Sequence, residues 1–193
     1  MNKPSNYEQT QAGGDFTPVD LGGHYAVIKN VKEMTTKNGD PMIVVSLDFD
    51  KRDAQADYFM DAYQNNTRVD KKWPNQATNY ITTEYQNACT KGFKSFVKAF
   101  ADSNGIDENG IKWGSDFCSQ FKNKKIGVVY GNVEELYNGE QKMRRKIRWF
   151  CDYNKVPDQN IPADKYLPNN AESSKDNSFV DVPATAEEEI PFD

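Results

Sequence analysis

The sequence predicts a mainly β domain in which five strands form a Greek-key barrel, with a helix between the third and fourth strands. Two pairs of strand-like segments flank Asn-Gly, at Asn38-Gly39 and Asn138-Gly139, and Asn-Gly between apolar runs is the strongest short hairpin signal. One intervening segment, 89–101, has helical spacing instead. Local patterns do not establish barrel closure, so an open sheet packed on a helix satisfies them equally well.

The first hairpin is predicted over residues 25–49. In the strand 25–34, Tyr25, Val27 and Val31 fall on one side, while the return strand 42–49 places four apolar residues on one face: Ile43, Val45, Leu47 and Phe49. A third strand is predicted over 58–64, after a short charged turn. Residues 65–88 are polar and lack a clear period, which indicates a long loop or insertion.

The second half contains the helix and two further strands. The helix 89–101 is indicated by apolar residues spaced for one helical face: Cys89, Phe93, Phe96, Val97 and Phe100. A short helix is expected over 115–121, and the last strands over 124–133 and 141–153. Three strands, a helix and two strands are the element order of an OB-fold.

Charge is distributed unevenly along the 193 residues. The net charge is −5, yet eight acidic residues and two lysines lie from Asp164 onward, which leaves 22 basic and 21 acidic residues in 1–163. The nearly neutral body and the acidic end predict three parts: a flexible arm over 1–20, the folded domain over 21–156, and a disordered linker with an acidic tip over 157–193.

The composition also limits the cellular setting and the cofactors. The sequence shows no membrane-spanning apolar run and no signal segment at its start, so neither a membrane partner nor export is expected. The three cysteines are odd in number and widely spaced, which argues against a disulfide framework. The sequence also lacks any Cys-x-x-Cys pair that could bind a metal. A cytoplasmic protein without a metal or another cofactor is expected.

The end of the chain carries a recognisable motif. Glu187, Glu188 and Glu189 are followed by Ile190-Pro191-Phe192, a solvated acidic run before two apolar side chains that can enter a pocket on another protein. The segment resembles the acidic tip of bacterial single-stranded-DNA-binding proteins. Those proteins end on the Phe, whereas Asp193 follows here.

The body extends this resemblance to bacteriophage single-stranded-DNA-binding proteins. Gly22-Gly23-His24-Tyr25 precedes the hairpin at 37–40 and a strand of Ile and Val. The resemblance implies an OB-fold that binds single-stranded DNA and a tip that recruits replication, recombination or repair enzymes. It also implies the cytoplasm of an infected bacterial host.

The last strand is the predicted nucleic-acid surface. Strict alternation puts Arg144, Lys146, Arg148 and Phe150 on one face and Met143, Ile147 and Trp149 on the other, with Arg145 as the exception. Because a two-residue step along a strand is about 7 Å, the three cations suit a sugar-phosphate track. Phe150 is expected to stack on a base. The alternative is an ordinary solvated sheet face.

The polar segment 65–88 interleaves cations with aromatic rings. Its candidate contacts are Arg68, Lys71, Lys72, Trp73 and Tyr80, because sequence-tolerant binding of single strands combines cations with stacking platforms. Trp73 is expected to stack on a base, although a loop Trp can also cover the edge of the barrel.

Catalytic chemistry has little support in the sequence, and no catalytic residue is assigned. His24 is the single histidine, and no Gly-rich phosphate loop is present. Four acids, Asp48, Asp50, Asp53 and Asp57, suggest a Mg²⁺-dependent nuclease as the enzyme alternative, although alternation places the first two on an exposed face. An RNA-binding OB module is the other alternative.

Overall fold

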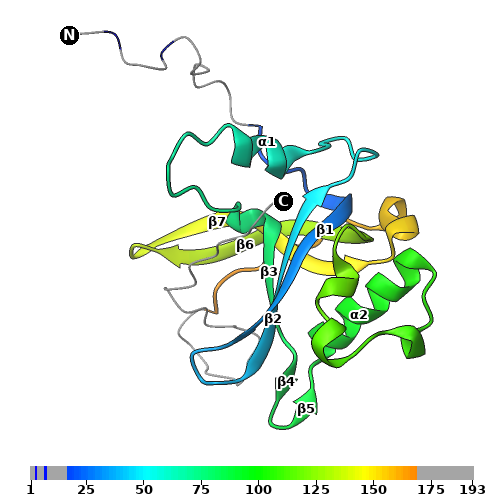
Figure 1. Ribbon diagram of the computed structural model, residues 1–193. Coiled ribbons are helices and arrows are strands. Elements are labelled where there is room, and N and C mark those ends of the chain that lie inside the picture. The colour runs from blue at the N-terminus through cyan, green and yellow to red at the C-terminus, as the bar shows by residue number, and fades with distance from the viewer. Residues whose placement is uncertain (1–2, 4–6, 8–16, 169–193) are drawn as a thin grey trace.

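A computed structural model describes residues 3, 7 and 17–168. Five strands form one antiparallel sheet with the spatial order β3-β2-β1-β6-β7 (Figure 1). They are β1 (Gly22–Thr35), β2 (Pro41–Phe49), β3 (Thr78–Thr82), β6 (Lys125–Tyr137) and β7 (Glu140–Cys151). A small separate hairpin contains β4 (Glu84–Tyr85) and β5 (Ala88–Cys89). The mainly β prediction with a helix after the third strand is confirmed.

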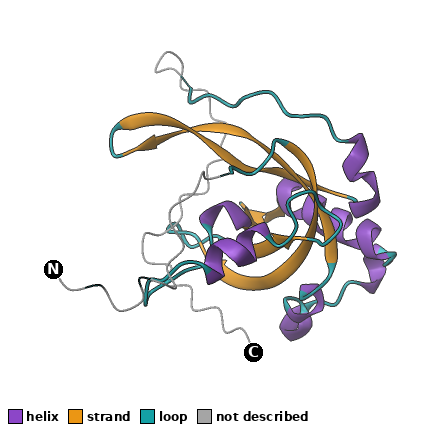
Figure 2. Ribbon diagram, turned by 90° about the horizontal axis from the view of Figure 1, so that it is seen from above, coloured by secondary structure: helices purple, strands orange, loops and turns teal. Residues whose placement is uncertain are grey.

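Helical segments surround this sheet (Figure 2). The two α-helices are α1 (Tyr58–Gln64) and α2 (Lys91–Asn104). The 3-10 turns are η1 (Asn75–Ala77), η2 (Glu108–Gly110), η3 (Gly114–Asp116), η4 (Ser119–Phe121) and η5 (Tyr153–Asp158). Within the described residues, no helix is long and apolar enough to cross a bilayer.

The strand β2 is buried on both faces. Its predicted inward face is confirmed, because Ile43, Val45, Leu47 and Phe49 all belong to the core. In β1 the core side chains are His24, Ala26 and Ile28, whereas Tyr25 and Val27 lie on the opposite, half-buried face. A register shift after Ile28 then brings Val31 into the core. A bulge therefore changes the face predicted from simple alternation.

The helix α2 begins and ends as its sequence specifies. The Thr90 side chain accepts a hydrogen bond from the Phe93 N–H at 3.2 Å, and Gly105 closes the helix in the left-handed region at φ 62°. The predicted aromatic face is buried, with the Phe100 and Phe121 rings 4.5 Å apart. Cys89 is exposed and lies before the helix, in β5.

The segment 58–64 is helical, so the predicted third strand there is wrong. The buried carboxylate of Asp48, on β2, accepts the Phe59 N–H at 3.0 Å at the start of α1. Burial raises the Asp48 pKa, against the lowering effect of hydrogen bonds from the Phe59 and Phe49 N–H groups and of Lys29. The third strand is β3, inside the region expected to be a loop, and it pairs with β2.

Both predicted ends of the folded domain also change. Val19, which was predicted to lie in a flexible N-terminal segment over 1–20, is fully buried. At the other end residues 159–167, here called the strap, continue past the predicted boundary at 156. Lys165 pairs with Val133 of β6, and the Glu134 N–H donates to the Lys165 carbonyl at 2.7 Å. The predicted tip, 187–193, lies outside the described residues.

A buried carboxylate fixes the start of β1 and gives the first prediction. Asp53 accepts hydrogen bonds from the Tyr25 N–H at 2.8 Å and the Gln55 N–H at 2.9 Å, and the His24 ring nitrogen lies 3.1 Å away. Burial raises the Asp53 pKa, but hydrogen bonds from His24, Gln55 and Tyr25 outweigh it, so the pKa is lowered. Asp53→Asn should therefore lower the free energy of unfolding at pH 7 by about 1–3 kcal/mol.

The loss should depend on pH with a defined sign. A carboxylate with a lowered native pKa stabilises the fold above its unfolded pKa of about 3.9, and this contribution disappears as pH falls through the lower native pKa. The difference between the wild type and Asp53→Asn in chemical denaturation should thus shrink below about pH 4. Asp70→Asn, at an exposed loop position, is the control. A pH-independent difference would contradict this role.

Candidate nucleic-acid interface

The ends of β6 and β7 form a projecting two-stranded ribbon, here called the arm (residues 131–148; Figures 1 and 2). β6 pairs with β1 only as far as Tyr130, after which its sheet partner is β7. The turn at the tip places Asn138 at φ 51° and Gly139 at φ 82°. Two residues with positive φ match the twist of a tight hairpin, which confirms the predicted Asn-Gly turn.

One side of the arm carries three cations against an aromatic ring. Lys142 and Arg144 lie over the Tyr137 ring, 5.7 and 5.0 Å from its centre, and Lys146 follows two residues further along β7. The three basic side chains are each nearly half exposed. Tyr137 is 51% exposed. These four residues are here called the cationic face.

An acidic residue partly neutralises the cationic face. Glu135 lies 3.9 Å from Arg144 and forms an ion pair with Lys146. Such exposed pairs contribute only about 0–1 kcal/mol and are screened by salt. A polyanion could therefore displace Glu135 at a small energetic cost.

A β-bulge at Arg148 overturns part of the predicted face. The pairing register of β6 with β7 shifts at this point: Val129 pairs with Trp149, but the next residue, Tyr130, pairs with Ile147. Arg148 is therefore the extra, unpaired residue in β7. After the bulge, Phe150 points inward and its ring lies 5.1 Å from that of Phe96. Phe150 is thus part of the packing against α2 and was wrongly predicted to stack on a base.

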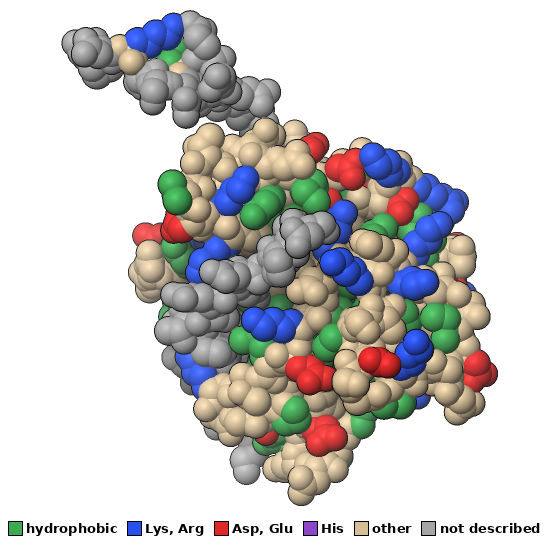
Figure 3. Space-filling view, viewed as in Figure 1, with side chains coloured by type: hydrophobic (Ala, Val, Ile, Leu, Met, Phe, Trp, Pro, Cys, Tyr) green, Lys and Arg blue, Asp and Glu red, His purple; other side chains and the backbone are tan. Residues whose placement is uncertain are grey.

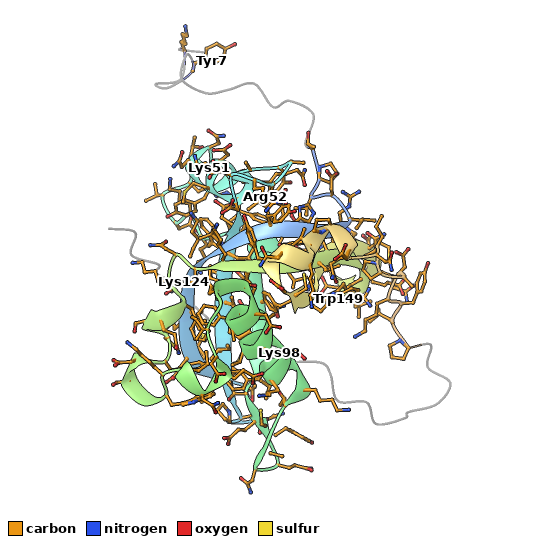
Figure 4. The ribbon with its side chains drawn as sticks, turned by 90° about the vertical axis from the view of Figure 1, so that its right-hand side faces the viewer. Tyr7, Lys51, Arg52, Lys98, Lys124 and Trp149 are labelled. Atoms are coloured by element: carbon orange, nitrogen blue, oxygen red, sulfur yellow. The ribbon has the colours of Figure 1, made fainter. Side chains whose placement is uncertain are left out.

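Arg148 is likewise not a member of the cationic face. Its guanidinium donates to the carbonyl of Ala163 in the strap at 2.9 Å and to that of Asn132 at 3.3 Å. Trp149, predicted on the opposite face, shares the side of Lys146, because the two pair with Val129 and Gly131. Trp149 is exposed (Figure 4) and donates from its indole nitrogen to Gln159 at 3.1 Å.

Trp73 is buried, which contradicts its predicted role in base stacking. Only 3% of its surface is exposed, and its ring lies 5.6 Å from that of Tyr63 on α1. Lys71 lies over the same Tyr63 ring at 4.6 Å, so this cation is also engaged within the body.

The other predicted loop residues are divided between two places. Arg68 and Lys72 are exposed on the segment that leads to η1, and Gln76 of η1 donates to the Arg145 carbonyl at 3.4 Å. This contact brings the end of the loop to the base of the arm. Tyr80 instead lies half-buried on β3, paired with Val44 of β2.

The acids proposed for a nuclease serve the fold. Asp48 of β2 is buried and accepts the Phe59 N–H at the start of α1. Asp50 accepts hydrogen bonds from the Arg52 N–H at 3.0 Å and from the Tyr153 hydroxyl at 3.0 Å. Burial and the Asp50 hydrogen bond raise the pKa of Tyr153 to about 12. Among the residues the structure describes, no group of three acidic, His or Cys side chains could hold a metal ion.

Sequence reasoning missed two members of the cationic face. Lys142 and Tyr137 flank the Asn-Gly turn. In the hairpin that this turn predicts, Tyr137 faces Glu140, and Lys142 lies two residues further along the same strand and therefore on the same side. That spacing was the available signal. Figure 3 shows that Lys and Arg side chains are scattered over the visible surface, so their number alone does not identify a site. The arm differs from the rest of this surface because it aligns three of them along one projecting element.

The burial of Trp73 generates a second prediction. Trp73→Ala should lower the free energy of unfolding by about 3–5 kcal/mol, the usual cost of removing a buried aromatic side chain. Arg68→Ala and Lys72→Ala, on the same segment but exposed, should stay within about 0.5 kcal/mol of the wild type in the same denaturation assay. A stable Trp73→Ala protein with a large loss of single-stranded-DNA affinity would restore the stacking role.

No protein-family model matches the chain, and no curated protein is significantly similar to it. Function is therefore inferred from the chemistry and geometry of the arm.

Proposed function

We propose that this protein binds single-stranded DNA without sequence specificity and that the cationic face of the arm is its principal contact. The observation that supports this most directly is the alignment of Lys142, Arg144 and Lys146 on one side of a projecting ribbon, beside the half-exposed ring of Tyr137. Alternate strand residues repeat at about 7 Å, a spacing suited to successive phosphates. A ring beside cations supplies a stacking platform that tolerates any base.

The architecture supports an OB-fold assignment. Three strands of the sheet come before α2 and two come after it, with α1 inserted between β2 and β3. The turn η1, at the β3 edge, approaches the β7 edge through the Gln76–Arg145 contact. OB-folds bind oligonucleotides through particular faces and loops, including the hairpin between strands four and five. In this proposed assignment, the arm corresponds to that hairpin. A matched single-stranded RNA is the competitor that would separate this proposal from an RNA-binding module, because only RNA offers the 2′-hydroxyl.

We also propose that the acidic tip, Glu187 to Phe192, recruits replication, recombination or repair enzymes. The acids keep the segment solvated, and Ile190 and Phe192 provide two apolar anchors for a pocket with basic residues at its rim. The strap ends beside the arm, where the Leu167 N–H donates to the Glu134 carboxylate at 3.0 Å. A bacteriophage origin, and hence the cytoplasm of an infected bacterium, belongs to the same proposal.

The third prediction tests the cationic face. Replacing Lys142, Arg144 and Lys146 together by Ala should weaken single-stranded DNA binding for every base composition. The slope of log K against log salt should fall by about 2, because each lost phosphate contact removes about 0.7. Fluorescence titration at several salt concentrations, with the fold checked by circular dichroism, measures both effects.

A matched control separates this surface from net charge. Replacing Lys51, Lys98 and Lys124 by Ala also removes three charges, but from exposed positions away from the arm (Figure 4). This variant should keep nearly the full slope. Glu135→Gln should act in the opposite direction and raise affinity at low salt. If the control triple lost as much slope as the arm triple, the cationic face would not be the principal contact.

The fourth prediction concerns the tip. Deleting residues 187–193 should leave folding intact, raise single-stranded-DNA affinity at low salt and abolish binding to the partner enzyme. A tethered polyanion has an effective concentration of about 1 mM at the body, so it competes with DNA until salt screens it. Titrations of the full and shortened chains across salt concentrations measure the difference.

Two point variants separate the functions of the tip. Phe192→Ala keeps every acid, so it should lose the partner while DNA affinity stays nearly unchanged. Removing Asp193 alone exposes a terminal Phe192 carboxylate, and tighter partner binding would show that this carboxylate is preferred. A shortened chain that bound DNA and partner as the full chain does would reduce the tip to a solubilising terminus.

A further inference from the structure

The strap adds a third strand to the base of the arm. Figure 2 shows it as a loop that runs alongside the arm. The Lys165 N–H donates to the Asn132 carbonyl at 3.0 Å, and the Glu134 N–H donates to the Lys165 carbonyl at 2.7 Å. These two bonds form a parallel bridge between Lys165 and Val133. The cationic face therefore borders on a further strand-like segment, which carries a cation of its own.

The pairing puts the Lys165 side chain on the side of the cationic face. Paired residues of neighbouring strands direct their side chains to the same side of a sheet, and Val133 is also paired with Arg144 of β7. Lys165, Val133 and Arg144 thus form one row across three strands. The two cations lie about 10 Å apart at the backbone, twice the spacing of neighbouring strands. Both are exposed, and Val133 between them is half-buried.

The acidic neighbours of Lys165 are held on the opposite side. Asp164 accepts a hydrogen bond from the Asn132 side chain at 2.9 Å, and the Glu134 carboxylate accepts one from a strap N–H at 3.0 Å. Asn132 and Glu134 flank Val133 in β6, so alternation turns both side chains away from the cationic face. The strap therefore presents the charge of Lys165, but not that of Asp164, on the side of the three arm cations.

The backbone of the strap is held at several points. Besides the two bonds of the bridge, the Arg148 guanidinium donates to the Ala163 carbonyl at 2.9 Å. Pro162 packs so closely over Gly131 that it leaves no room for a Cβ there. A cation on a backbone that is already ordered loses less conformational freedom on binding than one on an unrestrained segment. Lys165 therefore combines exposure with a fixed position beside the cationic face.

We propose that Lys165 is a fourth phosphate-binding cation, and that a bound single strand lies over Val133 with Lys165 on one flank and Arg144 on the other. This inference rests on the proposed function and adds a residue of the strap to a site on β6 and β7. The alternative is that an exposed lysine on the strap only discourages the addition of further strands, a common role at sheet edges. Salt dependence separates the two roles, because only a phosphate contact releases counterions.

The experiment measures binding of a fluorescein-labelled oligothymidylate of about 15 nucleotides, a length within the site size of one OB-fold. Lys165→Ala should lower the slope of log K against log salt by about 0.7 and weaken binding about tenfold at about 50 mM salt. Lys165→Arg keeps the charge and should restore both. Lys155→Ala removes another exposed charge, on η5, and is the matched control. It should bind as the wild type does.

The arm triple, in which Lys142, Arg144 and Lys146 are replaced by Ala, separates failure of this inference from failure of the proposed function. If the arm triple loses slope and Lys165→Ala does not, the bound strand does not reach the strap. The inference is then overturned while the proposed function stands. If neither variant loses slope, the proposed function fails as well.

Hydrogen exchange shows whether the strap stays in place. The Glu134 N–H donates to the backbone carbonyl of Lys165, so Lys165→Ala should leave the exchange of this amide unchanged in the free protein. If it exchanged faster, Lys165→Gln, which keeps most of the length of the side chain, would replace Lys165→Ala in every titration. Oligothymidylate should slow the exchange more in the wild type than in the variant, because a strand bound to Lys165 holds the strap against β6. Equal protection in both proteins would contradict the contact.

Discussion

The bulge at Arg148 lets β7 contact the core at two places and still carry the cationic face. On a regular strand, Ile147 and Phe150 would face opposite sides, since they are three positions apart and side chains alternate. One extra residue lets both contact the core, which secures α2 against the sheet through the Phe96–Phe150 contact. The same residue puts Trp149 on the side of Lys146, which lies opposite Ile147 by ordinary alternation. The core contact of Phe150 and the solvent-facing position of Trp149 therefore depend on one irregularity in hydrogen-bond register.

The strap depends on the same irregularity. Arg148 is not paired in the ladder with β6, and its guanidinium instead holds the Ala163 carbonyl. The strap then passes close to Gly131, where a Cβ would lie 2.4 Å from Pro162 Cγ and 2.9 Å from Arg148 Cγ. Only glycine permits this approach. Where the pairing of β6 with β1 ends, Lys165 continues the pairing, so this part of the β6 edge is covered.

The sequence correctly predicted those elements whose conformation is set by interactions between residues close together in the chain. Asn-Gly turns and the helical spacing of Phe93, Phe96 and Phe100 act over a few residues, and both hairpins and α2 form as expected. The segment 58–64 is different, because its start is held by Asp48 from another strand and its Phe59 enters the core. Tertiary contacts override its strand-like composition. Neither contact is visible in the segment itself.

The candidate site was predictable to the same degree. The basic strand was identified from its composition, and Arg144 and Lys146 lie where alternation puts them. Arg148 and Phe150 were misassigned because alternation assumes a regular ladder and a bulge leaves no local signature. Trp73 was misassigned because the polar sequence around it does not reveal that the folded chain buries its ring beside Tyr63.

An isolated two-stranded ribbon is only marginally stable in water, so the arm requires support beyond its own ladder. The strap covers one edge, and the Tyr137 ring under Lys142 and Arg144 ties the two strands together on one side. On the other side, Leu136 and Met143 are exposed and add little stability. In the proposed DNA complex, phosphates would replace Glu135 as the partner of Arg144 and Lys146, and Glu140 as the partner of Lys142. That exchange would hold the cationic face in place and make the ribbon more rigid.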